Sequence, residues 1–210
     1  MVKFRAIAFM AIPVCSRSLL EWGDREHWAD DMLRLFVGIG FPPELKLQLS
    51  SLCAGVPGAK WVEPGNFHLT LRFIGEVGEN IAADIDEALS RLRARRFTLQ
   101  IAGTGVFGGG DKPRSLWAGV ERTPQLSALR DKVEQAMIRA GLPPESRRFA
   151  PHVTLARLRA PALDQLRAFL VTHAQFRADP LPVESFSLVA SFPTKSGSVY
   201  EDQADYTLLH

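Results

Sequence analysis

A four-residue pattern, His-x-Thr followed by an apolar residue, occurs twice in this chain, each time inside a short apolar run. The first copy, FHLTL, contains His68 and Thr70, and the second copy, PHVTL, contains His152 and Thr154. Side chains alternate between the two faces of a β-strand, so each copy places its histidine and its threonine on one face and its apolar residues on the other. Two strands are therefore predicted, each with an imidazole beside a hydroxyl.

The surrounding elements repeat as well, because a strand and a helix precede each motif strand and a helix follows it. His152 comes 84 positions after His68 (152 − 68). Apolar periodicity and turn residues from Met32 onward predict the order β-α-β-β-α-β-β-α-β-α-β-β. Strands are expected at 33–39, 61–62, 67–75, 97–106, 115–120, 149–158, 183–192 and 198–209, and helices at 42–53, 81–95, 123–141 and 162–176, with a hairpin turn around 195–197.

This repeated order indicates a weak internal duplication, visible in the elements more than in residue identity. Two similar αβ lobes packed face to face would bring the two motif strands together. The cleft between the lobes would then contain both histidines and both threonines.

Residues 1–31 differ from the rest of the chain. Lys3 and Arg5 precede an apolar run, which resembles a signal peptide, but Pro13 interrupts the run and no clear cleavage site follows. We therefore expect residues 1–31 to be an atypical N-terminal extension, or the result of a start assigned too far upstream, rather than a targeting segment or an ordered addition. Residues 32–210 are expected to form a single bilobal domain.

Composition restricts the class of protein without identifying it. The 210 residues are 46% hydrophobic and 23% charged, which is typical of a soluble globular protein with a sizeable core. The net charge of +2 fits an anionic substrate but does not by itself indicate nucleic-acid binding. Two cysteines in unrelated contexts predict neither a disulfide framework nor a zinc motif, and no apolar run is long enough for a membrane span, so we expect a cytoplasmic protein.

Two imidazoles across a cleft form an acid–base pair, since histidine titrates near neutral pH and one ring can be protonated while the other is neutral. Phosphodiester cleavage needs such a pair, and hydroxyls beside the imidazoles can donate hydrogen bonds to phosphate oxygens. Strand alternation places Arg72 on the face of His68, as a candidate anion contact, but places Arg157 on the face opposite His152. Neither motif supplies the third ligand that a metal site usually needs, so no cofactor is predicted.

The segments FHLTLRFIG and PHVTLARL resemble the paired signatures of the two-histidine phosphoesterase superfamily. The resemblance is closest to the RNA 2′,3′-cyclic phosphodiesterases, also called 2′–5′ RNA ligases or LigT-like proteins. It extends from Met32 to about Leu209 and includes the segments MLRLFVGIGFPPEL, WVEPGNFHLTLRFIGEV and SVYEDQADYTL. It implies an α+β, bilobal fold in which two pseudo-symmetric lobes, with mostly antiparallel sheets and helices outside, flank a central cleft.

The resemblance also implies an activity, the metal-independent hydrolysis of RNA 2′,3′-cyclic phosphate ends to 2′-phosphomonoesters. In that reaction His68 would be the proton donor and His152 the proton acceptor. Thr70 and Thr154 would orient the phosphate, and Arg157 matches a phosphate-binding residue despite its expected strand face. The expected partner is RNA with a cyclic phosphate end, with tRNA fragments among the candidates, bound by a monomer without membrane contact.

Two other functions remain open from the sequence. The same site could catalyse 2′–5′ RNA ligation, or act on another cyclic or 2′–5′-linked nucleotide. Alternatively, the cleft could bind RNA without catalysis.

Overall fold

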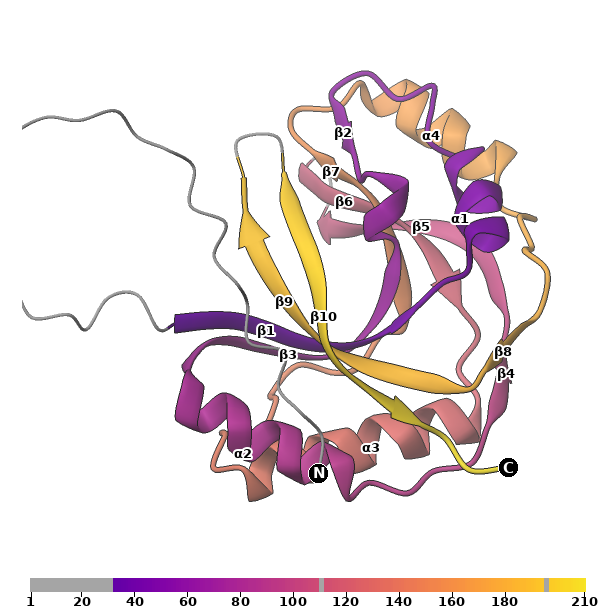
Figure 1. Cartoon of the computed structure of the whole chain (residues 1–210). Coiled ribbons are helices and arrows are strands. Elements are labelled where there is room, and N and C mark those ends of the chain that lie inside the picture. The colour runs from indigo at the N-terminus through magenta and orange to yellow at the C-terminus, as the bar shows by residue number, and fades with distance from the viewer. Residues whose placement is uncertain (1–31, 110–111, 195–196) are drawn as a thin grey trace, which may run out of the picture. The chain divides into compact units, whose positions relative to one another are not determined.

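The computed structural model describes residues 32–109, 112–194 and 197–210 (Figure 1). The expectation for residues 1–31 lies outside the described residues. The described part of the chain contains two four-stranded sheets, one with the order β10-β9-β1-β3 and the other with the order β2-β7-β6-β5, in which all strand pairs are antiparallel. The α+β, bilobal architecture expected from the sequence is confirmed.

The first sheet consists of β1 (Met32–Gly40), β3 (His68–Gly78), β9 (Ser185–Pro193) and β10 (Ser198–Thr207). The second consists of β2 (Ala59–Trp61), β5 (Ile101–Gly109), β6 (Lys112–Val120) and β7 (His152–Leu158). A two-stranded sheet joins β4 (Phe97–Leu99) to β8 (Leu181–Val183). The helices are α1 (Pro43–Ser50), α2 (Glu79–Ser90), α3 (Pro124–Arg139) and α4 (Leu163–Thr172), and η1 (Pro64–Asn66) is a short 3-10 turn.

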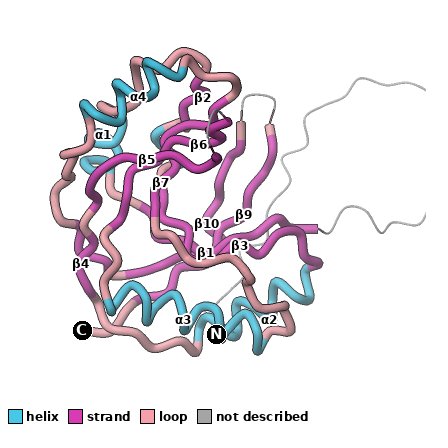
Figure 2. The backbone as a smooth tube through the Cα atoms, turned by 180° about the vertical axis from the view of Figure 1, so that it is seen from behind, coloured by secondary structure: helices cyan, strands magenta, loops and turns pink. Residues whose placement is uncertain are grey.

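Each of the two four-stranded sheets is completed or covered by a segment that connects two strands of the other sheet. The connection from β1 to β3 carries α1 and β2 to the second lobe, where β2 pairs with β7 and the Val62 amide donates to the Leu155 carbonyl at 2.8 Å. The connection from β6 to β7 carries α3 in the opposite direction, and α3 packs beside α2 against the first sheet (Figure 2). Each lobe therefore contains elements from both halves of the chain.

The core follows the predicted apolar periods. On α2, Ala82, Ile85 and Leu89 are buried at a spacing of three to four residues, so one face of the helix packs against the sheet. Helix α3 is capped at its N-terminus, because the Thr123 side chain accepts a hydrogen bond from the Leu126 amide at 3.1 Å. Among the described residues, no helix has the length and apolar character needed to cross a membrane.

The sequence did not predict the separate two-stranded sheet of β4 and β8. The segment 97–106, expected as a single strand, divides at Gln100 into β4 and β5, which belong to different sheets. The Gln100 side-chain amide donates to the carbonyls of Ile101 at 3.1 Å and Ala178 at 2.6 Å, which holds the chain where it changes sheets. Alternating apolar residues continue through this point, so the sequence does not reveal the change.

Gly105 illustrates how closely the second sheet is packed beside the motif strand. It pairs with Trp117 across β5 and β6, and a Cβ atom added at this position would lie 2.3 Å from the Trp117 ring. We expect Gly105→Ala to destabilise the protein by about 1–3 kcal/mol, because the indole must move. At Gly40 an added Cβ meets nothing within 4 Å, so Gly40→Ala should change stability by no more than about 0.5 kcal/mol. Chemical denaturation of both variants tests this, and equal losses would contradict it.

Candidate active site

Each motif lies at the beginning of its strand. His68 is the first residue of β3 and His152 is the first residue of β7. In both strands the histidine and the threonine are half-buried, while the apolar residues between and after them are buried. The alternation predicted from the sequence is therefore present over the length of both motifs.

The strands β3 and β7 approach each other between the two sheets. A cleft of about 610 Å³ lies there, and His68, Thr70, His152 and Thr154 all line it. The structure thus brings the two motifs together, although their histidines and their threonines are each 84 residues apart in the sequence (152 − 68 and 154 − 70). The cleft expected between the lobes is present, with the predicted imidazoles and hydroxyls in its walls.

Both motif strands contain a β-bulge three residues after the histidine. In β3, Thr70 pairs with Gly38 and Arg72 with Val37, so Leu71 is an additional residue without its own partner. In β7, Thr154 pairs with Trp117 and Ala156 with Leu116, which makes Leu155 the additional residue. A bulge shifts the alternation by one position, so residues beyond it change faces.

The bulge in β7 explains the position of Arg157. Simple alternation placed Arg157 on the face opposite His152, and that prediction was wrong. After the bulge, Ala156 and Leu158 are buried while Arg157 is exposed and lines the cleft with His152 and Thr154. Arg157 therefore lies in the cleft with both motifs, and its contact with a phosphate stays a prediction.

The same shift removes Arg72 from the face of His68. Phe73 takes the cleft-side position, since the Phe36 ring contacts both the His68 ring, at 4.6 Å between centroids, and the Phe73 ring, at 5.9 Å. Arg72 reaches the edge of the cleft, but its guanidinium is occupied by protein groups.

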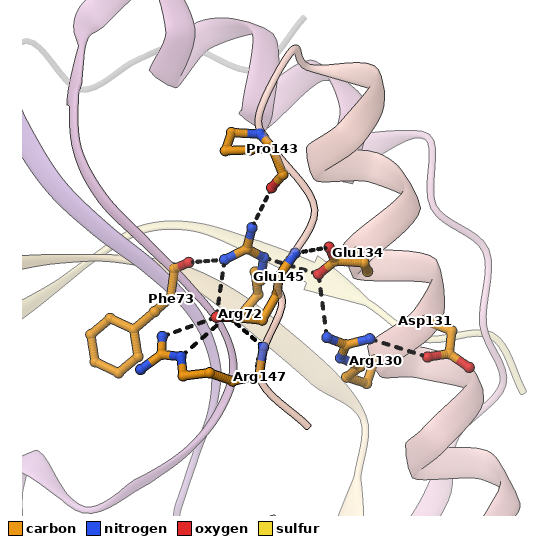
Figure 3. Close-up of polar contacts among 8 residues, drawn as sticks. All are labelled: Arg72, Phe73, Arg130, Asp131, Glu134, Pro143, Glu145 and Arg147. Atoms are coloured by element: carbon orange, nitrogen blue, oxygen red, sulfur yellow. Dashed lines mark hydrogen bonds and ion pairs between the residues drawn. The ribbon is translucent and has the colours of Figure 1, made fainter. Parts of the chain in front are cut away.

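The partners of Arg72 are shown in Figure 3. Its Nε lies 2.9 Å from a Glu134 carboxylate oxygen, one Nη lies 3.4 Å from Glu145, and the Nη groups donate to the carbonyls of Phe73 at 2.5 Å and Pro143 at 2.7 Å. Arg72 therefore joins β3 to α3 and to the loop that follows α3. The strand face predicted for Arg72 was wrong, because the bulge turns it toward α3, and its role as an anion contact stays a prediction.

Both histidines are held in the same way. His68 Nδ1 lies 2.7 Å from the Asn66 carbonyl oxygen, and His152 Nδ1 lies 2.7 Å from the Ala150 carbonyl oxygen. A carbonyl can only accept, so in each neutral ring Nδ1 carries the proton and Nε2 keeps the lone pair. Each motif thus leaves Nε2 for proton transfer in the cleft.

The two rings differ in their surroundings. His68 stacks on Phe36, has the Tyr200 ring edge-on at 5.1 Å, and has Nε2 3.0 Å from the Thr70 hydroxyl oxygen. His152 has Phe107 edge-on at 4.7 Å and is less deeply buried than His68. His68 is therefore more tightly enclosed than His152.

Burial lowers the pKa of both His68 and His152 below the usual value of 6.5. The Asn66 and Ala150 carbonyls oppose this effect, because they favour the protonated ring. The charge of His152, and to a smaller extent that of Lys46, lowers the pKa of His68 further. The two imidazoles are therefore close enough to influence each other electrostatically.

Positive charge surrounds the two histidines. Among the described residues that line the cleft, Glu145 is the one acidic side chain, and six are arginines. These arginines are Arg72, Arg114, Arg130, Arg147, Arg148 and Arg157. A cleft with this excess of positive side chains attracts an anion such as a phosphate group.

Several cleft residues were not predicted from the sequence. Phe107, Arg114, Arg147 and Tyr200 come from different strands and loops, and no local motif marks any of them. Only the tertiary fold brings them to the histidines. Within the described ranges, no group of three or more His, Cys, Asp or Glu side chains is arranged to hold a metal ion.

The sequence and the fold both match known proteins. The family model of LigT-like phosphoesterases matches residues 39–117 and 119–200. An RNA 2′,3′-cyclic phosphodiesterase from Aeropyrum pernix is 40% identical over 158 residues, which cover 74% of this chain and 89% of the relative. Another from Archaeoglobus fulgidus is 30% identical over 173 residues, covering 81% of this chain and 97% of the relative.

Solved structures agree with the sequence relatives. A crystal structure described as a phosphoesterase superposes with a TM-score of 0.71 at 25% identity, covering 85% of this chain and 99% of the other. The crystal structure of Escherichia coli LigT complexed with 3′-AMP gives a TM-score of 0.69 at 26% identity, covering 86% of this chain and all of that one, 100%.

The hydrogen bonds and burial of the two rings predict their titration. We expect His68 and His152 to titrate below pH 6.5 in the free protein and to be Nδ1-protonated when neutral. We also expect His152→Gln to raise the pKa of His68, because it removes a nearby positive charge. NMR of the ring nitrogens measures both quantities. A midpoint at or above pH 6.5 for either free ring would contradict this description.

Proposed function

Because this chain belongs to the family of LigT-like phosphoesterases, we propose that it hydrolyses the 2′,3′-cyclic phosphodiester at the end of an RNA to a 2′-phosphomonoester. The observation that carries the proposal is the pair of histidines in one basic cleft, each held through Nδ1 so that Nε2 is left for proton transfer. The relatives from Aeropyrum pernix and Archaeoglobus fulgidus are both named RNA 2′,3′-cyclic phosphodiesterase.

In the proposed complex the cyclic phosphate lies between the two imidazoles. Arg157 supplies a charge-assisted contact to a phosphate oxygen, and the Thr154 hydroxyl donates a hydrogen bond to another. The Thr70 hydroxyl, 3.0 Å from His68 Nε2, can donate to that nitrogen when the ring is neutral. When His68 is protonated, Nε2 becomes a donor and the Thr70 hydroxyl is released to donate to the phosphate.

In the proposed reaction one histidine accepts a proton and the other donates one. His152 Nε2 removes a proton from a water molecule, and the water oxygen forms a bond to phosphorus. The bond from phosphorus to the 3′ oxygen breaks, and His68 Nε2–H gives its proton to that oxygen. The products are a 2′-phosphomonoester and a free 3′-hydroxyl, and the two rings have exchanged protonation states.

The assignment of donor and acceptor follows the family resemblance. The enclosed setting of His68 supports it, since an ordered ring with a hydroxyl against Nε2 can hold a proton in a fixed direction. The more open His152 is suited to a mobile water molecule. tRNA fragments as the physiological RNA, the monomeric state and the cytoplasmic location remain predictions.

The proposal predicts the effect of removing either imidazole. We expect wild-type protein to convert a short RNA ending in a 2′,3′-cyclic phosphate to the 2′-phosphate in the presence of EDTA, because the proposed steps use imidazole and hydroxyl groups. His68→Ala and His152→Ala should each lower the single-turnover rate by at least about 100-fold. His173→Ala, which changes a histidine outside the cleft, is the matched control and should retain the wild-type rate.

Product analysis separates this proposal from the alternatives. Joining of two RNA fragments would indicate ligation, and binding without turnover would indicate a non-catalytic RNA-binding protein. Turnover that requires a divalent metal would contradict the mechanism, even if the product were the same.

The depressed pKa values predict an acid-shifted rate profile. Catalysis needs one ring neutral and one protonated, so kcat/KM falls as pH rises through the higher apparent pKa of the free pair. Since burial lowers the pKa of both rings below 6.5, kcat/KM should already be declining above pH 6.5. Bound phosphate favours protonated imidazole, so the decline of kcat should occur at higher pH. A kcat/KM that rises between about pH 6.5 and 8 would contradict this.

A further inference from the structure

The cleft continues into a second hollow of about 590 Å³ between β3 and the loop that follows α3. Four side chains line both spaces, so the two hollows meet along a common border. These border residues are Arg72, Phe73, Glu145 and Arg147. A ligand that extends from the histidines across this border would enter the second hollow.

Phe73 is the prominent side chain on this border. It is 46% exposed, although it is a large aromatic residue. Its ring contacts Phe36, and Phe36 stacks on His68, so the three rings form a row from the catalytic imidazole to the border. A scattered exposed aromatic residue needs no explanation, but an exposed ring next to a phosphate site is a surface on which a nucleobase can stack.

The charges around the second hollow suit a phosphodiester. Arg34 lies on β1 and is exposed, and Arg147 lies on the opposite loop. Among the described residues that line this hollow, Glu145 is the one acidic side chain, and Arg147 and Arg72 pair with it at 2.9 and 3.4 Å. Hydrogen bonds from Arg147 lower the pKa of Glu145 to about 2, so this carboxylate stays ionised and paired. The net charge of the side chains that line the hollow is therefore positive.

The loop is held firmly enough to form a binding wall. The Glu145 amide donates to Glu134 on α3 at 2.7 Å, and Arg72 donates to the Pro143 carbonyl at 2.7 Å. Glu145 in turn accepts hydrogen bonds from the Arg147 amide at 3.0 Å and from Arg147 Nε at 3.2 Å (Figure 3). Arg72 thus helps to position Arg147, because both arginines pair with Glu145.

We propose that the second hollow binds the nucleotide that precedes the cyclic phosphate end of the RNA. Its base stacks on Phe73, and its phosphodiester lies near Arg147 and Arg34. This inference rests on the proposed function, because it places the cyclic phosphate between His68 and His152. An RNA ending in a cyclic phosphate continues through the 5′ oxygen of its last nucleoside. The preceding phosphate and base must therefore extend beyond the cleft, and the second hollow adjoins the cleft. The enzyme therefore favours an RNA end over a free cyclic mononucleotide.

The test compares two substrates with the same terminal nucleoside. One is the nucleoside 2′,3′-cyclic monophosphate, and the other is the dinucleotide that ends in it. Stacking contributes about 1–3 kcal/mol per base, so the ratio of kcat/KM for dinucleotide over mononucleotide should be at least about fivefold in the wild type. Phe73→Ala should reduce this ratio toward one, and Phe73→Trp should retain it.

Matched controls exclude a general effect of removing an exposed side chain. Phe192, on β9, is 38% exposed and lines neither hollow, so Phe192→Ala should keep the wild-type ratio. Arg34 lines the second hollow but not the cleft, so Arg34→Gln should lower the ratio and weaken its dependence on salt. Arg95→Gln removes an exposed arginine outside both hollows and should change neither.

The outcomes separate this inference from the proposed function. Equal kcat/KM for the two substrates in the wild type would overturn the inference and leave the hydrolase intact. An equal fall of the ratio in Phe73→Ala and Phe192→Ala would also overturn it, because the effect would not be specific to the hollow. Absence of hydrolysis for both substrates would overturn the proposed function and this inference together.

Discussion

The approach of β3 to β7 is the constraint on which the site depends, and it results from the exchange of segments between the two halves of the chain. β2 pairs with β7 in the second sheet, while α3 packs against the first. Neither lobe is complete without a segment from the other half, so the lobes cannot be separated without unpairing strands. Main-chain pairing thereby links the two lobes, each of which contributes one histidine to the cleft.

The repeated motif and the periodicity of the sequence predicted most of the fold and the four central side chains. They failed where the main chain departs from regular alternation. Leu71 and Leu155 look like ordinary buried strand residues, and nothing in their identity marks a bulge. Because each bulge reverses the faces beyond it, the alternation argument misplaced both Arg72 and Arg157. The outer cleft residues, such as Phe107 and Tyr200, depend on tertiary contacts that no local pattern encodes.

The two motifs give the site near-equivalent parts with unequal surroundings. Both imidazoles have the same hydrogen bond to a carbonyl two residues earlier, which fixes their tautomers in the same way. The rings packed around them differ: His68 lies against Phe36 and Tyr200, and His152 lies against Phe107. Duplication can thus supply two copies of one proton-transfer group, and packing can then distinguish an acid from a base without a change in the motif.

The two bulges add a second difference between the halves of the site. The fifth residue after each histidine is brought to the cleft side, and there the two halves differ: one has Phe73 and the other has Arg157. An RNA strand has a direction, whereas a truly two-fold site would accept it equally well in either orientation. An aromatic ring at one end and a cation at the other break that equivalence. Together with the unequal rings around the two histidines, this pair of positions allows the pseudo-symmetric scaffold to distinguish the two directions of a bound strand.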